Sequence, residues 1–238
     1  MNAKQLFDDG KVQEAIQALG VWLREHPTDS QQRIFLFELL CFAGQYDRAE
    51  KQLGVLSQAS NQTEMGAILY YSALHGEKTR NDVFQKQEFP QAPASPSPAG
   101  TLNGKPFLSI RDADPEIGAR LEVFAAGSYL WIPFEHIISI RMDPPRRLRD
   151  TLWAPATVLT GPSFKGTELG EVLIPAVYPF SWRHPDETIW LGRATAWEAD
   201  EKGTEYPMGQ KLFLADGDEV PLLEIRTLEF AAAQSAPA

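Results

Sequence analysis

A segment near the N-terminus recurs 34 residues later, and this repeat constrains the fold more than any other feature of the chain. The run LFDDGKVQEAIQAL, residues 6–19, aligns without gaps with LCFAGQYDRAEKQL, residues 40–53. Both copies have a leucine at each end, a glycine at the fifth position and an alanine at the tenth. Because the matched positions include both glycines and both alanines, a chance similarity between two amphipathic helix pairs is disfavoured.

The matched glycines and alanines have clear physical roles. Gly10 and Gly44 are predicted to end the first helix of each unit, because glycine adopts a left-handed or tight turn at little cost. Ala15 and Ala49 are small, as required where two antiparallel helices approach closely. A period of 34 residues is typical of tetratricopeptide (TPR) helical hairpins. We therefore predict TPR-like antiparallel hairpins, with a third, degenerate hairpin over residues 63–87.

Prolines separate this region from the rest of the chain. The segment PQAPASPSPAG, residues 90–100, contains four prolines and favours an extended spacer. From Thr101 onward, short runs rich in Val, Ile and aromatic residues alternate with turn residues, which predicts β strands. The predicted fold class is α+β. A TPR-like helical domain spans residues 1–89, a linker 90–100, a barrel-like or sandwich-like β-rich domain 101–230, and a disordered tail 231–238.

Composition narrows the function. The 238 residues carry a formal net charge of −10, and neither part of the chain has a basic patch, which disfavours binding to nucleic acid or to anionic membranes. No apolar run is long enough to cross a membrane, and the N-terminal sequence lacks the apolar core of a signal peptide. Cys41 is the single cysteine, so an intrachain disulfide is impossible. These features predict a cytoplasmic protein.

No catalytic motif is present. The chain has no GxSxG elbow, Walker loop, CxxC or HExxH motif, and GPSFKG at residues 161–166 lacks the ending of a phosphate-binding loop. His136 and His184 are open to a metal or catalytic interpretation with acidic residues, for example His184 with Asp186, but spacing alone does not establish such a site. We therefore predict a protein that is not an enzyme and has no cofactor or metal.

The first helix of each TPR hairpin lines a concave face, and this face is one candidate binding site. In the 34-residue register it carries Lys4, Asp8, Ser72 and His75 together with the candidate partner-binding residues Phe7, Ile34, Glu38, Cys41, Phe42 and Ile68. The face is mixed but largely apolar, which favours an amphipathic helix as the ligand. Some of these side chains must also pack the small array itself. Phe42→Glu is the substitution predicted to test this groove.

A second candidate is the segment DPPRRLRDTLWAPA, residues 143–156. Arg146, Arg147, Arg149 and Trp153 are of types enriched at binding hot spots. The alternative is an ordinary ion-paired turn in which Trp153 covers the β core, and both interpretations stay open. The aromatic run VYPFSWRHPDETIW, residues 177–190, is expected to lie mostly in the core.

Several phrases of the chain are similar to those of a known family. Besides the repeats, YLWIPFEHIISI (129–140), the 143–156 segment, GEVLIPAVYPFSW (170–182) and LGRATAW (191–197) resemble the ImpE/SciE family, also called TagJ. The resemblance implies a cytoplasmic, non-catalytic accessory protein of type VI secretion. It implies as partner the N-terminal helix of the small contractile-sheath subunit, and through the sheath a link to the ClpV-type ATPase.

Three hypotheses follow from the sequence. The leading one is an adaptor that recognises an amphipathic helix of a sheath component. The second is an enzyme or small-molecule-binding β domain, which requires Arg146–Arg149 and His184 to meet in one pocket. The third is a TPR scaffold in an unrelated assembly.

Overall fold

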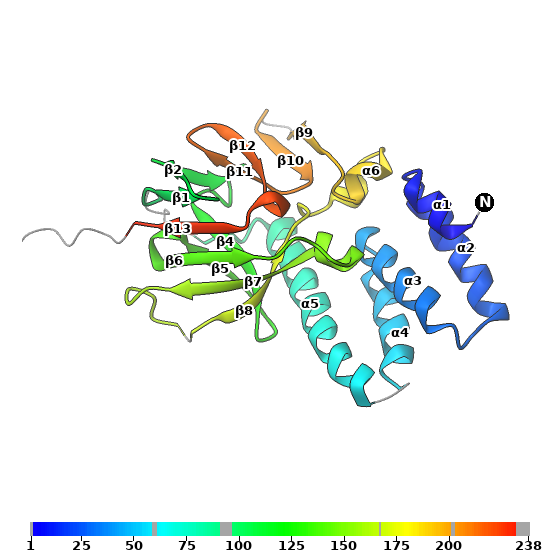
Figure 1. The fold of residues 1–238 in the computed structure, drawn as a ribbon. Coiled ribbons are helices and arrows are strands. Elements are labelled where there is room, and N and C mark those ends of the chain that lie inside the picture. Colours follow the sequence, from blue (N-terminus) through cyan, green and yellow to red (C-terminus); the bar gives the residue numbers. More distant parts are fainter. Residues whose placement is uncertain (1, 59–60, 91–96, 167, 201–202, 232–238) are drawn as a thin grey trace, which may run out of the picture.

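The computed structural model describes residues 2–58, 61–90, 97–166, 168–200 and 203–231. Helices occupy one side of the molecule and strands the other, as Figure 1 shows. The mixed α+β class predicted from the sequence is confirmed. All of the predicted tail except Ala231, and most of the predicted Pro-rich linker, lie outside the described residues.

Four helices form the two predicted hairpins. The first pairs α1 (Ala3–Asp8) with α2 (Val12–Glu25), and the second pairs α3 (Ser30–Phe42) with α4 (Tyr46–Ser57). Gly10 and Gly44 lie in the turns with φ angles of 78° and 66°, in the left-handed region that favours glycine. Asp29 caps α3 by accepting a hydrogen bond from the backbone N–H of Gln32 at 3.1 Å.

The predicted third hairpin is wrong, because residues 61–86 form one long helix, α5 (Asn61–Lys86). Gly76, the one glycine in the second half of this helix, does not open a turn. It lies inside the helix, where a Cβ atom would come within 2.5 Å of the Phe124 ring. The glycine therefore serves a close contact between α5 and the β domain. With no left-handed residue at this position, the helix continues to Lys86, and Gln87 follows with a φ angle of 55°.

The main sheet has eight antiparallel strands. Their order is β2 (Lys105–Phe107), β1 (Gly100–Leu102), β13 (Thr227–Phe230), β6 (Ile137–Met142), β7 (Trp153–Thr160), β8 (Gly170–Pro175), β4 (Arg120–Ala125) and β5 (Ser128–Pro133). Strands β2 and β5 are its edges, so within the described residues the sheet is open and the closed-barrel option is excluded. Ala126 and Gly127 turn β4 into β5 with φ angles of 47° and 80°, as expected of a tight hairpin.

Smaller elements surround this sheet. Strands β3 (Ile110–Asp112), β11 (Leu212–Ala215) and β12 (Asp218–Pro221) form one small sheet, and β9 (Thr195–Ala199) pairs with β10 (Glu205–Gly209). A short helix, α6 (Glu187–Trp190), precedes β9. Single 3-10 turns cover Phe134–His136, Leu148–Thr151, Ser181–Arg183 and Leu222–Glu224.

The helices and the β domain share one apolar core. Phe37 of α3 lies 6.4 Å from Trp153 of β7, and the same cluster continues through Phe124, Leu173 and Trp190. A second cluster lies within the β domain itself. Two hairpins are too few to form a stable array alone, and the β domain supplies the missing cover.

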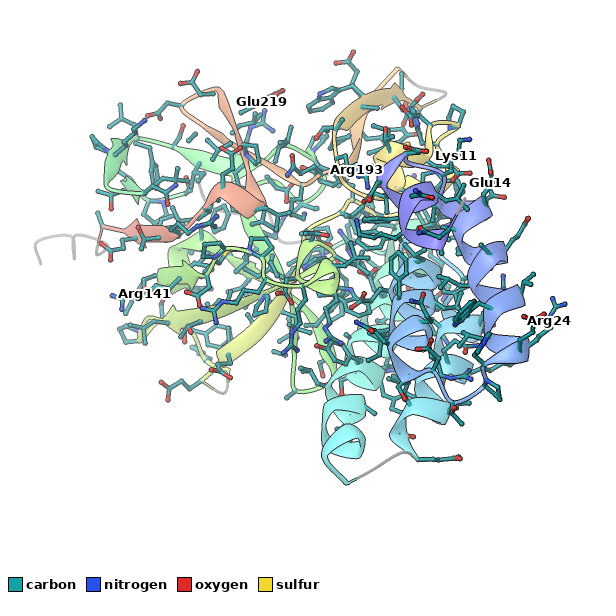
Figure 2. The ribbon with its side chains drawn as sticks, turned by 45° about the vertical axis from the view of Figure 1, so that its right-hand side comes forward. Lys11, Glu14, Arg24, Arg141, Arg193 and Glu219 are labelled. Atoms are coloured by element: carbon teal, nitrogen blue, oxygen red, sulfur yellow. The ribbon has the colours of Figure 1, made fainter. Side chains whose placement is uncertain are left out.

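The turns of both hairpins rest on residues 181–193. A Cβ atom on Gly44 would lie 2.4 Å from the Trp182 ring, and one on Gly10 would lie 2.7 Å from Thr188 Cγ2. Arg193 donates hydrogen bonds to the carbonyls of Phe7 and Asp8 at 2.7 and 2.9 Å (Figure 2). These contacts hold the 181–193 segment against the array.

Opposite charges strengthen this docking. The cationic guanidinium of Arg193 meets the carbonyl end of α1, whereas the carboxylate of Glu187 accepts the backbone N–H of Gln13 at the start of α2 at 3.0 Å. Each charge therefore lies at the helix end that carries the opposite partial charge.

Candidate functional site

A large groove lies between α5 and the main sheet. We call it the α5–sheet groove, and its volume is about 1100 Å³. In Figure 1, α5 lies close to the sheet at its C-terminal end and diverges from β7 and β8 toward its N-terminal end. The groove lies on the diverging side, between residues 68–73 of α5 and strands β6, β7 and β8.

Apolar side chains make up most of the walls. On the helix side Leu69 is 50% exposed, and its neighbour Ile68 is more exposed still. On the sheet side the apolar lining residues are Phe124, Met142, Pro144, Trp153, Pro155, Ala156, Val172 and Leu173. Most of these sheet residues are buried, so the exposed apolar surface at the groove comes from Ile68 and Leu69 of α5 together with Pro144 and Pro155. Exposed apolar side chains beside a concave, largely apolar site mark a candidate binding site.

The 143–156 segment forms one end of the groove, and its three arginines point in different directions. Arg146 is exposed and pairs with Asp143 at 2.9 Å. Asp150 accepts the backbone N–H groups of Arg146 and Arg147 at 2.9 and 3.0 Å, which fixes the turn. Arg149 alone turns toward the helices, where its guanidinium lies 4.7 Å from the centre of the Tyr70 ring.

Trp153 is buried at the floor of the groove. Its indole N–H donates to Glu77 of α5 at 3.1 Å, and its ring stacks on Tyr70 at 6.2 Å. The structure thus brings together Ile68, Arg149 and Trp153, which the sequence analysis had placed in two separate candidate sites.

The concave face of the TPR array is occupied by the chain itself. Cys41 and Phe42 are buried and lie with Leu152, Val177 and Trp182 around a void of only about 10 Å³. A partner helix cannot reach these two side chains while the β domain is in place. Phe42→Glu would place a charge in the core and would report on stability rather than on binding.

The other candidates on the concave face are scattered. Glu38 is buried beside Arg149, with Oε1 3.7 Å from Arg149 Nε. Phe7 is half-buried beneath Arg193, whose guanidinium lies 4.7 Å from its ring centre, and Ile34 is also half-buried. Arg147 is exposed on the outer side of its turn.

Sequence reasoning missed a buried ionic cluster at the junction of α5 and the β domain. Arg80 donates to both carboxylate oxygens of Glu122 at 2.8 and 2.9 Å. Lys211 Nζ lies 2.6 Å from both Glu122 and Asp112. Burial opposes the charge on Glu122, but the two cations prevail and lower the pKa of this carboxyl to about 2.

The remaining carboxyl groups of the cluster are less well compensated. Burial raises the pKa of Glu77 and of Asp112, although Arg80 and Lys211 respectively counteract it. The only sequence signal for this cluster is a charge inside an apolar run, as in RLEVFAA (120–126) and QKLFLA (210–215). Such a run does not reveal which charges meet. The cluster fastens α5 to the sheet.

His184 does not share a cavity with Arg149. His184 Nδ1 accepts the backbone N–H of Asp186 at 3.0 Å, and His184 lines a separate cavity of about 460 Å³ beside β10. Arg149 and His184 therefore belong to different cavities, which removes the main support for an enzymatic site built from both. Across the described ranges, no group of three or more His, Cys, Asp or Glu side chains is arranged to hold a metal ion. No helix in this part of the chain has the length and hydropathy needed to cross a membrane.

Comparisons with known proteins agree with this architecture. Residues 104–229 match the family model described as ImpE protein, and residues 6–69 match a tetratricopeptide repeat model. The type VI secretion system accessory component TagJ of Pseudomonas aeruginosa is 30% identical over 269 aligned positions, which cover 97% of this chain and 91% of that protein.

A solved structure has the same fold. The crystal structure of protein VPA1032 from Vibrio parahaemolyticus superposes with a TM-score of 0.84 and 20% identity, covering 98% of both chains. The family model spans more than half of this chain, and the TagJ relative spans nearly all of it. This chain therefore belongs to the ImpE (TagJ) family of type VI secretion accessory proteins.

Proposed function

We propose that this protein is a non-catalytic adaptor that binds the N-terminal helix of the small contractile-sheath subunit of a type VI secretion system in the cytoplasm. Through the sheath it is linked to the ClpV-type ATPase. Membership of the ImpE family supports the accessory role, and the TPR hairpins are typical of proteins that bind other proteins. The identity of the partner rests on the family resemblance.

The α5–sheet groove is the docking site in this proposal. The observation that carries it is the exposed apolar pair Ile68 and Leu69 facing an apolar sheet wall across about 1100 Å³. Pockets for small molecules have volumes of roughly 300–1,000 Å³, and this groove lies at or above their upper end. A largely apolar groove bordered by charged residues suits one face of an amphipathic helix.

Calorimetric titration with the N-terminal helix peptide of the co-encoded small sheath subunit tests the proposal. Leu69→Glu places a charge on the open helix wall and is expected to weaken binding at least about tenfold, because a charge at the centre of an apolar interface is left desolvated. Val21→Glu is the matched control. Val21 is also on a helix and is similarly exposed at 53%, but it lies on α2, outside the groove.

Each outcome has a distinct meaning. Loss of binding in Leu69→Glu with retention in Val21→Glu supports an adaptor that uses this groove. Equal binding by both variants and the unaltered protein would move the site elsewhere on the surface. An unaltered protein that binds no sheath peptide would overturn the proposed partner.

A further inference from the structure

We propose that Arg149 recognises a carboxylate side chain on the helix that docks in the α5–sheet groove. This inference rests on the proposed function and adds a specificity determinant to it. The partner helix would carry one aspartate or glutamate within its apolar face, placed to meet the end of the groove formed by residues 143–156.

The main observation is that Arg149 has unused hydrogen-bond donors. Its Nε is buried without a hydrogen-bond partner, and none of the hydrogen bonds found in the described residues involves its guanidinium. The nearest carboxylate oxygen, on Glu38, is 3.7 Å from Nε, beyond the usual limit of about 3.2 Å for such a bond. Arg80, by contrast, uses its guanidinium on Glu122 and on the carbonyl of Val177.

A buried donor without a partner costs free energy unless a ligand satisfies it. The adjacent carboxylate does not fill this role, because Asp150 accepts the backbone N–H groups of Arg146 and Arg147 instead. Glu38 is incompletely compensated as well, since burial raises its pKa to about 6 although Arg149 is the nearest cation. Nε is enclosed beside Glu38, so the donors left for a further acceptor are those of the two Nη groups.

The arginine is also held in position for a ligand. Its side chain is 16% exposed, and its guanidinium lies over the ring of Tyr70 at 4.7 Å. Both residues line the groove. A stacked guanidinium presents its edge as a rigid fork, which matches the two oxygens of a carboxylate.

The charges around the groove favour one carboxylate over a polyanion. Arg141, Arg149 and Arg226 line it, and so do Asp143, Asp150 and Glu171. Three cations and three anions leave no net positive field to attract a phosphate or an acidic segment. Recognition therefore depends on the local geometry at Arg149.

A double-mutant cycle by calorimetry tests this inference with the sheath peptide described above. Arg149→Lys keeps a positive charge beside Glu38 but removes the planar fork. In the peptide, each Asp is replaced in turn by Asn and each Glu by Gln. Arg149→Lys is expected to weaken binding about tenfold or more, and one peptide replacement should weaken it to a similar degree. Combining these two changes should cause little further loss.

Arg141→Lys is the matched control, because this arginine lines the same groove but its side chain is 70% exposed (Figure 2). It is expected to change the affinity less than about twofold. Unchanged binding by Arg149→Lys, or losses that add independently for every peptide position, would overturn the inference while leaving the adaptor intact. Absence of binding by the unaltered protein would overturn both. Circular dichroism of each variant checks that the fold is retained.

Discussion

The carboxyl groups buried at the junction of α5 and the β domain differ sharply in how far nearby cations offset the cost of burying their negative charge. Glu122 is paired with two cations, whereas Asp114 is only 5% exposed and no ion pair of it is found in the described part of the chain. Asp114 Oδ1 accepts the backbone N–H of Glu116 at 2.9 Å. Burial, reinforced by the nearby charge of Asp112, raises the pKa of Asp114 from 3.8 to about 6. Ionised Asp114 is therefore a destabilising element at neutral pH.

Asp114→Asn is expected to stabilise the protein at pH 7. Between pH about 4 and 6 the folded state holds a proton on Asp114 that the unfolded state has lost, so this group makes stability fall as the pH rises through that window. Asparagine keeps the acceptor for Glu116 and removes the charge. We expect a gain on the order of 1–3 kcal/mol at pH 7 that disappears near pH 4, measured by urea unfolding at both pH values.

Asp218→Asn, at an exposed position of β12, is the control for this measurement and should change little at either pH. Destabilisation by Asp114→Asn at pH 7 would show that the carboxylate is compensated in the folded protein and would contradict the argument from burial.

Among the elements, the sequence predicts those whose signals are local. The paired glycines predict both helical hairpins. The long helix α5 was not predicted, because the repeat was extended into residues 63–87 as a degenerate hairpin, and the contact of Gly76 with Phe124 is not visible in the sequence. Leu152 and Trp182 fill the concave face, and they are more than a hundred residues away in the sequence from Cys41 and Phe42. No local sequence pattern reveals such a contact.

The candidate site was only partly predictable for the same reason. Ile68 was identified from the repeat register, and Arg149 and Trp153 from their residue types. That these three side chains line one groove follows from the packing of α5 against β7, which is a tertiary relationship. The register also placed Cys41 and Phe42 on an open face, because it describes an array without a domain packed against it.

Gly44→Ala is expected to destabilise the protein by about 2 kcal/mol or more. Its φ of 66° disfavours any residue with a Cβ, and that atom would lie 2.4 Å from the Trp182 ring. Gly20→Ala is the control, since Gly20 lies within α2 with no atom within 4 Å of an added Cβ. It should stabilise by up to about 1 kcal/mol. Thermal and urea unfolding measure both, and similar effects of the two variants would contradict the close approach to Trp182.

In the whole molecule, the helical array and the β domain depend on one another. Phe37 and Cys41 share a core with Leu152 and Trp153, and Arg80 of α5 pairs with Glu122 of β4. Separating the two parts would expose this core and leave buried charges without partners. The proline-containing segment therefore joins two parts that pack together, and the division of the chain at residues 90–100 stays a prediction.

The shared core predicts one cooperative unfolding transition. Far-ultraviolet circular dichroism reports mainly on the helices, and tryptophan fluorescence reports on six tryptophans, of which Trp153, Trp182 and Trp190 lie near the junction. The two probes should give coincident midpoints in a thermal scan. A fragment of residues 1–89 is expected to lack a cooperative transition, because its inner face would be uncovered. Two separate transitions in the full chain would contradict the mutual dependence.

Because the turns of both hairpins pack against residues 181–193, the β domain constrains the number of helical repeats. An ordinary solenoid gains or loses a unit by duplication at little cost, because each repeat touches only its neighbours. In this protein Gly10 packs against Thr188 and Gly44 packs against Trp182. An extra hairpin between the two would move one of these turns away from its contact by the length of a whole repeat. We therefore expect gain or loss of a repeat, which open arrays tolerate, to disrupt the packing in this protein. The domain that imposes this constraint begins more than forty residues after the second hairpin ends.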